Sequence, residues 1–182
     1  MFDRLVKINN YSKNKVMKKI AKNILEKLYC CEINCIEIDK STKFAHHARG
    51  CTIIASKICE NTVIFQNVTV GSNLRYNKEK GEWENLGNPI IDKNTVICDG
   101  AKILGPVIVG ENSVIAAGAI VTKDIPSNSI VCGVNKFRER DISYDIAYNS
   151  NMVDYIRLIE TNKRLIKNFE ANILKKNIDG NY

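Results

Sequence analysis

The middle of the chain carries an aliphatic residue at every sixth position. The series from residue 91 onward is Ile91, Ile97, Ile103, Val109, Ile115 and Val121. A period of six fits neither an amphipathic helix nor a single long strand. It is typical of a coil in which short flat strands meet at tight corners and each strand directs one aliphatic side chain into a narrow interior.

A second column with the same period supports this interpretation. Small or β-branched residues stand two positions before the aliphatic ones, at Thr95, Ala101, Val107, Ser113 and Ala119. The aliphatic register also occurs earlier in the chain, at Ile58, Ile64 and Val70. Repeated aliphatic positions establish a core and not an activity, so the function has to be sought in what interrupts the repeat.

Two segments interrupt the repeat. Ile91 follows Val70 by 21 positions, although one repeat takes six, so residues 72–88 are predicted to form a loop ejected from the coil. This insertion is polar and charged, and it holds Trp83, the only tryptophan of the chain. The second interruption, near residues 43–54, contains the sequence HHARG. Long loops on a regular scaffold are frequent places for function.

Both ends of the chain have helical periodicity. Residues 13–28 place apolar side chains four apart, opposite a lysine-rich face, at Val16, Ile20, Ile24 and Leu28. Residues 151–175 place them at steps of three and four with one longer step, at Met152, Ile156, Ile159, Ile166, Phe169 and Ile173. We expect both stripes to be packing faces, against the coil or against a neighbouring subunit.

Composition and charge narrow the class of protein. With 182 residues, 45% hydrophobic and 26% charged, the chain fits one globular domain with an appendage, not a disordered or collagen-like protein. The net charge of +7 is concentrated in residues 1–28, which hold eight Lys or Arg and two Asp or Glu. Nucleic-acid binding is not expected, because these cations lie on one short helix without interleaved aromatics. A peripheral membrane contact through this helix is an alternative that we rank below packing.

The apolar runs and the cysteines indicate in which cellular compartment the protein is expected. The apolar runs are too short to span a bilayer, and the lysine-rich start lacks the apolar core of a signal peptide. Seven cysteines without a CxxC pair argue against a complete disulfide framework and against a zinc site. We therefore expect a cytoplasmic protein that holds no metal.

At this point the sequence resembles a known family. The stretch GAKILGPVIVGENSVIAAGAIVTKDIPSNSIVCGV, residues 100–134, resembles the signature of hexapeptide-repeat acyltransferases, whose fold is a left-handed parallel β-helix. Residues 46–71 resemble more narrowly the serine acetyltransferase branch and its short capsule- or antibiotic-associated relatives. Together with the helical ends, this divides the chain into an N-terminal helical segment at 1–35, a left-handed β-helix acetyltransferase domain at 36–134 with the ejected loop at 72–88, and a C-terminal helical extension at 135–182. The resemblance also implies a homotrimer that binds acetyl-CoA between adjacent coils.

The resemblance implies that a histidine removes the proton of an acceptor hydroxyl as that hydroxyl attacks the thioester, without an acyl-enzyme. A neutral imidazole can accept this proton near pH 7. The family's catalytic histidine stands three residues before a glycine, which assigns the role to His47 and leaves its neighbour His46 as the fallback. Glu37 takes the place of the carboxylate that orients the imidazole in the serine branch. The spacing between Glu37 and His47 is shorter here, and an ordinary solvated glutamate is the alternative interpretation.

The resemblance also implies contacts with acetyl-CoA. The positions concerned are Gly100, Ala101, Gly118, Ala119, Lys123, Lys136 and Arg138. The two glycine–alanine pairs fall at predicted corners, where a missing or one-carbon side chain lets a pantetheine arm lie against the backbone. The cations suit the pantetheine region and the phosphates of the cofactor.

Two classes of acceptor are considered, L-serine and a sugar hydroxyl. Serine acetyltransferases carry a second histidine in the loop before the strand that here begins at Pro89, and this chain has Asn88 there, without a positive charge. Aromatic rings such as that of Trp83 stack on sugar faces, so we assign Asn67, Trp83 and Asn88 to the acceptor. We predict an acetyl-CoA-dependent O-acetyltransferase whose acceptor is a sugar of a surface (capsular) polysaccharide or L-serine. The alternatives are a serine acetyltransferase of cysteine biosynthesis and a non-catalytic trimeric scaffold.

Overall fold

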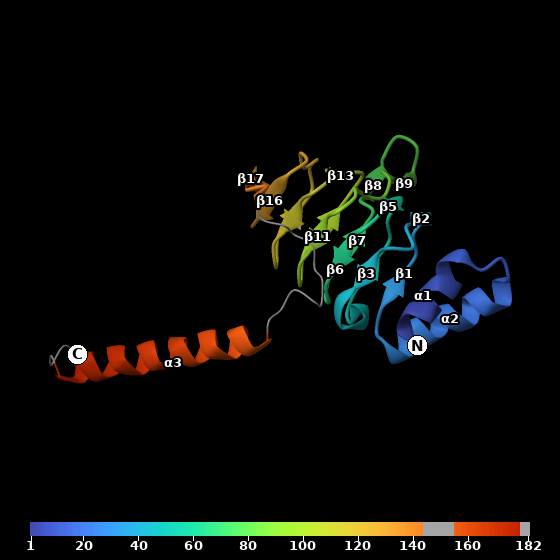
Figure 1. Ribbon diagram of the computed structural model, residues 1–182. Helices are drawn as coiled ribbons and strands as arrows, with labels where there is room; N and C mark the ends of the chain where they lie inside the picture. Colours follow the sequence, from blue (N-terminus) through green and yellow to red (C-terminus); the bar gives the residue numbers. More distant parts are fainter. Residues whose placement is uncertain (144–154, 179–182) are drawn as a thin grey trace. The chain divides into compact units, whose positions relative to one another are not determined.

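The computed structural model describes residues 1–143 and 155–178. The chain divides into two compact units, 1–146 and 147–182, which we describe separately. The first unit is a coil of short strands that form three parallel sheets, with two helices at its N-terminal end (Figure 1). Each of the first four turns of the coil contributes one strand to each sheet, as the six-residue period predicts.

Sheets A and B form two faces of the coil. Sheet A contains, in order, β1 (Glu32–Ile33), β4 (Thr52–Ile53), β7 (Thr69–Gly71), β12 (Lys102–Leu104) and β15 (Ile120–Val121). Sheet B contains β2 (Glu37–Ile38), β5 (Lys57–Ile58), β10 (Ile90–Ile91) and β13 (Ile108–Val109). Neighbouring strands are parallel and in register, so that equivalent residues of successive repeats stack on one another.

Sheet C forms the third face and closes the C-terminal end of the coil. Its parallel strands are β3 (Lys43–Phe44), β6 (Val63–Ile64), β11 (Val96–Ile97), β14 (Val114–Ile115) and β16 (Ser129–Cys132). The strand β17 (Lys136–Glu139) then turns back and pairs with β16 in the antiparallel direction. An antiparallel strand at this position covers the edge that β16 leaves open.

The interior of the coil confirms the six-residue pattern. All aliphatic residues of the predicted series are fully buried, from Ile58, Ile64 and Val70 to Ile91, Ile97, Ile103, Val109, Ile115 and Val121. The small residues that precede them are buried as well, at Thr62, Val68, Thr95, Ala101, Val107, Ser113 and Ala119. A narrow interior has room for one large side chain on each strand, which is why the residue two positions earlier has to be smaller.

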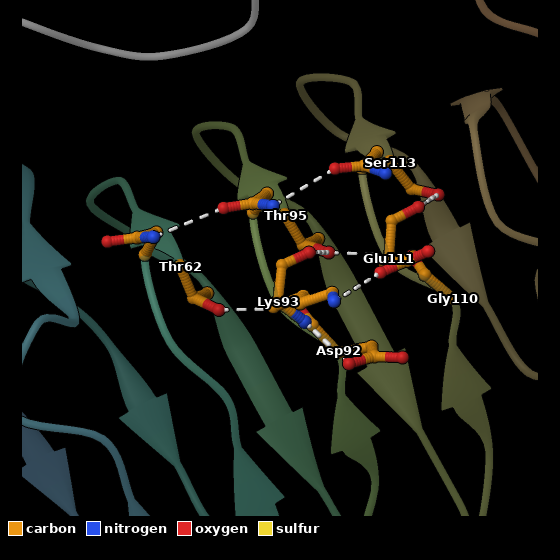
Figure 2. A network of polar contacts seen from close by, with 10 residues as sticks. Thr62, Asp92, Lys93, Thr95, Gly110, Glu111 and Ser113 are labelled. Atoms are coloured by element: carbon orange, nitrogen blue, oxygen red, sulfur yellow. Dashed lines mark hydrogen bonds and ion pairs between the residues drawn. The ribbon is translucent and has the colours of Figure 1, made fainter.

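The buried hydroxyls of this small column are satisfied by neighbouring carbonyls (Figure 2). Thr62 Oγ1 donates to the carbonyl of Cys59 at 2.9 Å, and Ser113 Oγ donates to that of Pro126 at 3.2 Å. On the outer side of the same corner Lys93 Nζ lies 3.1 Å from Glu111 Oε2. Polar residues are therefore tolerated inside the coil, because the carbonyls of the corners accept their hydrogen bonds.

The corners between sheets B and C consist of asparagines in the left-handed region of φ. The residues are Asn61, Asn94, Asn112 and Asn128, with φ between 54° and 57°. Asparagine tolerates this conformation better than most side chains. The amide of Asn94 donates to Asn112 Oδ1 at 3.1 Å, and that of Asn61 donates to Asn94 Oδ1 at 3.3 Å. The ladder of amides thus links successive turns of the coil.

We expect Gly110→Ala to destabilise the coil where Gly71→Ala does not. A Cβ at Gly110 would lie 2.5 Å from the nitrogen of Ser127 and 2.8 Å from the carbonyl carbon of Pro126, both backbone atoms of the next turn. Such overpacking costs about 1–3 kcal/mol of unfolding free energy. Gly71 has no atom within 4 Å of an added Cβ, which makes it the matched control. Urea unfolding of the two variants measures the difference, and equal midpoints would contradict this packing of the corner.

The N-terminal segment contains two helices where one was predicted. Helix α1 (Phe2–Tyr11) precedes α2 (Lys15–Leu28), and Asn14 caps α2 by accepting from the backbone N–H of Val16 at 2.9 Å. Helix α1 covers the start of the coil, because Asn9 Nδ2 donates to the carbonyl of Ile33 at 2.6 Å and the hydroxyl of Tyr11 donates to that of Ile38. These bonds satisfy carbonyls of the first turn, which has no preceding turn of the coil.

Within one chain, helix α2 packs through a face next to the predicted stripe. Ala21 and Leu25 are buried, whereas Val16, Ile20 and Leu28 are exposed. Packing of the stripe against the coil is therefore wrong, because the helix turns the neighbouring face towards α1 and the coil, and packing against a neighbouring subunit stays a prediction.

The insertion and the C-terminal helix complete the described chain. Residues 72–88 contain an antiparallel hairpin of β8 (Leu74–Asn77) and β9 (Glu82–Asn85), inserted between β7 and β10 (Figure 1). Helix α3 (Tyr155–Ile178) belongs to the second unit, and Ile159, Ile166 and Phe169 are exposed on it. The predicted Met152 lies outside the described residues. None of the helices in the described parts of the chain is both long and apolar enough to cross a membrane.

Candidate active site

The histidines and several of the predicted ligand contacts lie at one edge of the coil. At this edge, which we call the A–C edge, the chain passes from sheet C to sheet A. Its turns are linked by backbone hydrogen bonds: the N–H of Asn67 donates to Arg49 at 2.7 Å, and that of Gly100 donates to Gln66 at 3.2 Å. The next turn continues the series, where the N–H of Gly118 donates to Asp99 at 2.9 Å.

The histidine turn has an unusual backbone. After β3 ends, His46, His47 and Ala48 all lie in the left-handed region, with φ of 51°, 57° and 52°. Each residue with a side chain costs about 1–2 kcal/mol in this conformation, and such strain is concentrated at functional sites. The turn leaves both imidazoles exposed and buries Ala48 between them and the interior.

Gly50 closes the histidine turn against the next turn of the coil. Its φ is 70°, and a Cβ at this position would lie 2.4 Å from Asn67 Oδ1. The amide of Asn67 in turn donates from Nδ2 to Asp99 Oδ1 at 3.0 Å. The positive φ favours glycine three residues after His47, and the absence of a side chain there lets Asn67 lie close to the histidine turn.

The two imidazoles have different neighbours. The ring of His47 lies 5.4 Å from that of Phe2 and 5.7 Å from that of Tyr29, so the N-terminal helices hold it. The ring of His46 lies 6.3 Å from that of Phe65, on the neighbouring turn of the coil. Packing against two aromatic rings restricts the orientations that His47 adopts. Among the residues that the structure describes, neither imidazole is bonded to a carboxylate.

Glu37 is not brought to His47 within one chain. It lies on β2, and its Oε2 is 3.0 Å from Lys57 Nζ in an exposed ion pair. The hydrogen bond with Glu37 raises the pKa of Lys57. The geometry of the single chain therefore matches the solvated glutamate that was the alternative interpretation of this residue.

Of each predicted glycine–alanine pair, only the glycine remains available at the surface. Gly100 and Gly118 lie at the A–C edge with φ of 71° and 68°, and a Cβ on Gly118 would meet no atom within 4 Å. Ala101 and Ala119 are fully buried in the small interior column, so their side chains cannot touch a ligand outside the coil. The sequence placed both residues of each pair at the corner, whereas the glycine occupies the corner and the alanine directly precedes the strand.

The predicted cationic contacts lie at the C-terminal end of the coil. Lys123, Lys136 and Arg138 are exposed. Lys123 and Lys136 directly follow the hydrogen-bonded pair Thr122 and Asn135, in which Asn135 Nδ2 donates to Thr122 Oγ1 at 2.8 Å. The segments that carry these two lysines are thus fixed side by side, at the same end of the coil.

The acceptor residues of the insertion lie on a different edge from the histidines. The hairpin β8–β9 leaves the coil between sheets A and B, and Trp83 on it is 68% exposed, with its ring 5.5 Å from that of Tyr76. Asn88 accepts from Ser56 Oγ through its backbone carbonyl at 3.1 Å. Its side-chain Oδ1 is buried without a hydrogen-bond partner in the described parts of the chain.

The sequence analysis missed the polar cluster that stiffens this hairpin. Glu84 Oε2 lies 2.9 Å from Arg75 Nε, and its Oε1 accepts from Lys80 at 3.2 Å and from Asn77 at 2.8 Å. Hydrogen bonds from Asn77, Arg75 and Lys80 lower the pKa of Glu84. The alternation of charged and aromatic residues in 74–85 was the available signal, because it places the ions on one face and Tyr76 and Trp83 on the other.

Buried thiols are poor nucleophiles in this structure. Burial raises the pKa of Cys31 to about 12 and that of Cys35 to about 11, and it also raises the pKa of Cys51. These thiols are protonated at neutral pH and unsuited to forming an acyl-enzyme. No group of three or more metal-binding side chains occurs in the described part of the chain.

Comparisons with known proteins agree with this fold. Residues 88–123 match the family described as bacterial transferase hexapeptide (six repeats). The chain is 38% identical over 94 residues to the serine acetyltransferase of Bacillus subtilis, a match that covers 50% of this chain and 39% of that protein. It is 44% identical over 92 residues to the serine acetyltransferase of Buchnera aphidicola, covering 48% of this chain and 32% of that protein. The matched region thus spans between a third and two fifths of these relatives.

A solved structure has the same architecture. The serine acetyltransferase of Neisseria gonorrhoeae superposes with a TM-score of 0.60 at 24% identity, covering 82% of this chain and 57% of that one. The predicted fold class, a left-handed β-helix of hexapeptide repeats with terminal helices, is confirmed. The predicted resemblance to hexapeptide-repeat acyltransferases, and among them to serine acetyltransferases, is confirmed as well.

Proposed function

We propose that this chain is an O-acetyltransferase that transfers an acetyl group from acetyl-CoA to an acceptor hydroxyl, with His47 as the general base. The observation that carries the proposal is the left-handed histidine turn, which displays His47 on the edge that also holds Asn67, Gly100 and Gly118. A strained turn that exposes an imidazole beside an edge of side-chain-free corners suits a base next to an extended ligand. The similarity to named serine acetyltransferases supports the reaction class.

In the proposed reaction the imidazole first accepts a proton and then releases it. The acceptor hydroxyl forms a bond to the thioester carbonyl carbon while its proton passes to a ring nitrogen of His47. When the carbon–sulfur bond breaks, the CoA thiolate leaves and the imidazolium returns the proton to it. The ring contacts of His47 with Phe2 and Tyr29 hold the imidazole in place for this transfer.

Acetyl-CoA enters the proposal as a co-substrate at the A–C edge. The open space over Gly118 and the adjoining corner at Gly100 allow a pantetheine arm to approach the backbone. The exposed cations Lys123, Lys136 and Arg138 are the proposed partners of its phosphates. We assign no cofactor contact to the side chains of the two buried alanines.

We propose a homotrimer, and the division of the proposed site between two edges of one chain supports an assembly of several copies. Sheet A separates the A–C edge, with His47, from the edge that carries Trp83 and Asn88, so that one chain does not join the two groups. A neighbouring copy that presents its hairpin to the histidine turn completes the site. We also propose that the protein works in the cytoplasm, where its seven free cysteines persist as thiols.

The proposed acceptor is a saccharide or L-serine. The exposed pair of Tyr76 and Trp83 favours a sugar ring, because aromatic faces stack on sugars and a stiff hairpin presents them. The relatives named serine acetyltransferases favour L-serine. Asn88 is compatible with either acceptor, since an amide donates and accepts hydrogen bonds without charge.

Consumption of acetyl-CoA by the purified chain tests the proposal and separates the acceptors. The loss of thioester absorbance is followed with L-serine and with a panel of amino sugars, neutral sugars and oligosaccharides. We expect turnover with one of these classes: turnover with L-serine makes the chain a short serine acetyltransferase, and turnover only with saccharides makes it a modifier of surface polysaccharides. Absence of turnover together with absence of acetyl-CoA binding in calorimetry would contradict the proposal and favour a trimeric scaffold.

A further inference from the structure

The N-terminal helical hairpin has an apolar face that the first unit leaves uncovered. On α2, Val16 is 67%, Ile20 49% and Leu28 61% exposed. The face continues into an open groove of about 280 Å³ between α1 and α2, to which Ile8 and Met17 contribute. Exposed aliphatic side chains that form a contiguous patch, in contrast to single scattered ones, are typical of a protein, ligand or membrane interaction site.

Cations surround this face. Residues 1–28 hold eight Lys or Arg and two Asp or Glu, a net charge of +6. Lys15 and Lys19 directly precede Val16 and Ile20 on α2, so they border the apolar stripe, and Arg4 lines the groove. Within the described part of the chain, Lys22 is the one cation of this hairpin that forms ion pairs.

The combination of an apolar stripe with bordering cations suits some classes of partner better than others. A second copy of the hairpin would bring a charge of +6 against another +6, which opposes association. A nucleic acid would attract the cations but would leave the aliphatic stripe in water. An anionic bilayer surface suits both the cations and the apolar stripe. Its headgroups attract the lysines, while the apolar side chains are buried at the boundary of the acyl chains.

We propose that the outer face of the α1–α2 hairpin, formed by Val16, Met17, Ile20 and Leu28 with the bordering cations, docks on an anionic phospholipid membrane. The helices lie in the interface and do not cross it. Their opposite face stays on the coil, where Phe2, Val6 and Leu25 are buried. The lysine stems are long enough to lie along the apolar surface while their ammonium groups reach the headgroups.

Co-sedimentation of the full chain with vesicles tests the proposal without any assay of acetyl transfer. Vesicles of phosphatidylcholine alone are compared with vesicles of phosphatidylcholine and phosphatidylglycerol, at low and at high salt. We expect binding to the mixed vesicles that weakens as salt screens the charges, and little binding to the neutral ones. Ile20→Asp is expected to abolish binding, because it puts a carboxylate into the acyl boundary.

Two pairs of lysine substitutions distinguish binding through the proposed face from a general attraction between the cationic protein and the anionic vesicle. Lys15→Gln with Lys19→Gln should weaken binding to the mixed vesicles about tenfold or more, given about 1 kcal/mol for each cation at an anionic surface. Lys43→Gln with Lys78→Gln removes the same charge from exposed sites elsewhere and should leave binding nearly unchanged. Both variants keep their buried contacts, which circular dichroism checks.

Several results would overturn the docking proposal. They are equal binding to neutral and anionic vesicles, no binding to anionic vesicles at low salt, and equal losses in the two lysine pairs. Unchanged vesicle binding in Ile20→Asp, together with a smaller mass by light scattering, would show instead that the face joins copies of the chain. None of these results alters the outcome of the acetyl-CoA assay, so the two proposals fail separately.

Discussion

Replacement of His47 by alanine is expected to lower the rate of acetyl transfer by about 10²–10⁴-fold, the usual contribution of a general base. The left-handed turn exposes this imidazole, and the rings of Phe2 and Tyr29 restrict its orientation. Without it the acceptor hydroxyl has to attack the thioester while it keeps its proton. The loss should appear in kcat, and acetyl-CoA binding measured by calorimetry should stay close to that of the unchanged chain, because the proposed cofactor site consists of backbone corners and does not include this imidazole.

His46→Ala is the matched control for this prediction. It removes the same type of side chain from the adjacent residue of the same turn, at nearly the same φ. We expect its turnover to stay near that of the unchanged chain, since His46 lies toward Phe65 and not between the two aromatic rings that hold His47. Full activity in His47→Ala would rule out this residue as the base, and a loss restricted to His46→Ala would transfer the role to His46.

Ile97→Ala is expected to cost about 2–5 kcal/mol of unfolding free energy, as large-to-small substitutions in a packed core do. Ile97 is fully buried on β11, in the middle of sheet C, and stacks between Ile64 and Ile115 of the adjacent turns. Alanine there leaves a cavity that the surrounding strands cannot close, because each is held by backbone hydrogen bonds on both sides.

Ile108→Ala provides the comparison for the core substitution. Ile108 also lies on a two-residue strand, but its side chain points outward and is 49% exposed. Its loss should change the free energy of unfolding by less than about 1 kcal/mol, since little burial is given up. Chemical denaturation of both variants measures the two values. A cost of similar size at both positions would contradict the alternation of inward and outward residues in these strands.

The sequence determined the coil because its period is a local property. The coil strands from β1 to β15 that form the three sheets have only two or three residues each, so an aliphatic residue every six positions, with a small one two places before, already specifies which side chains enter the interior. The insertion at 72–88 was visible for the same reason, as a break in that period. The family resemblance predicts that Gly100 and Gly118 belong to the site, and both lie on one edge of the coil with the histidines.

The packing face of α2 and the partner of Glu37 could not be predicted from the pattern of residues along the chain. The spacing of Val16, Ile20 and Leu28 predicts a packing face against the coil or a neighbouring subunit. Within one chain, α2 is instead covered on the side that faces α1 and the coil, which depends on contacts distant in the sequence. The pairing of Glu37 with Lys57, and not with a histidine, likewise depends on which strands become neighbours in sheet B.

The sequence by itself thus determined the architecture, and only the tertiary structure decided how the chemistry is distributed over it. Both histidines could be named from HHARG, but the left-handed turn that exposes them is seen only in the structure, and the rings beside His47 are brought there by the N-terminal segment. The physical reason is that core positions follow from a local period and the narrow interior. The neighbours of a surface side chain are set by the stacking of turns and helices that lie far apart in the sequence.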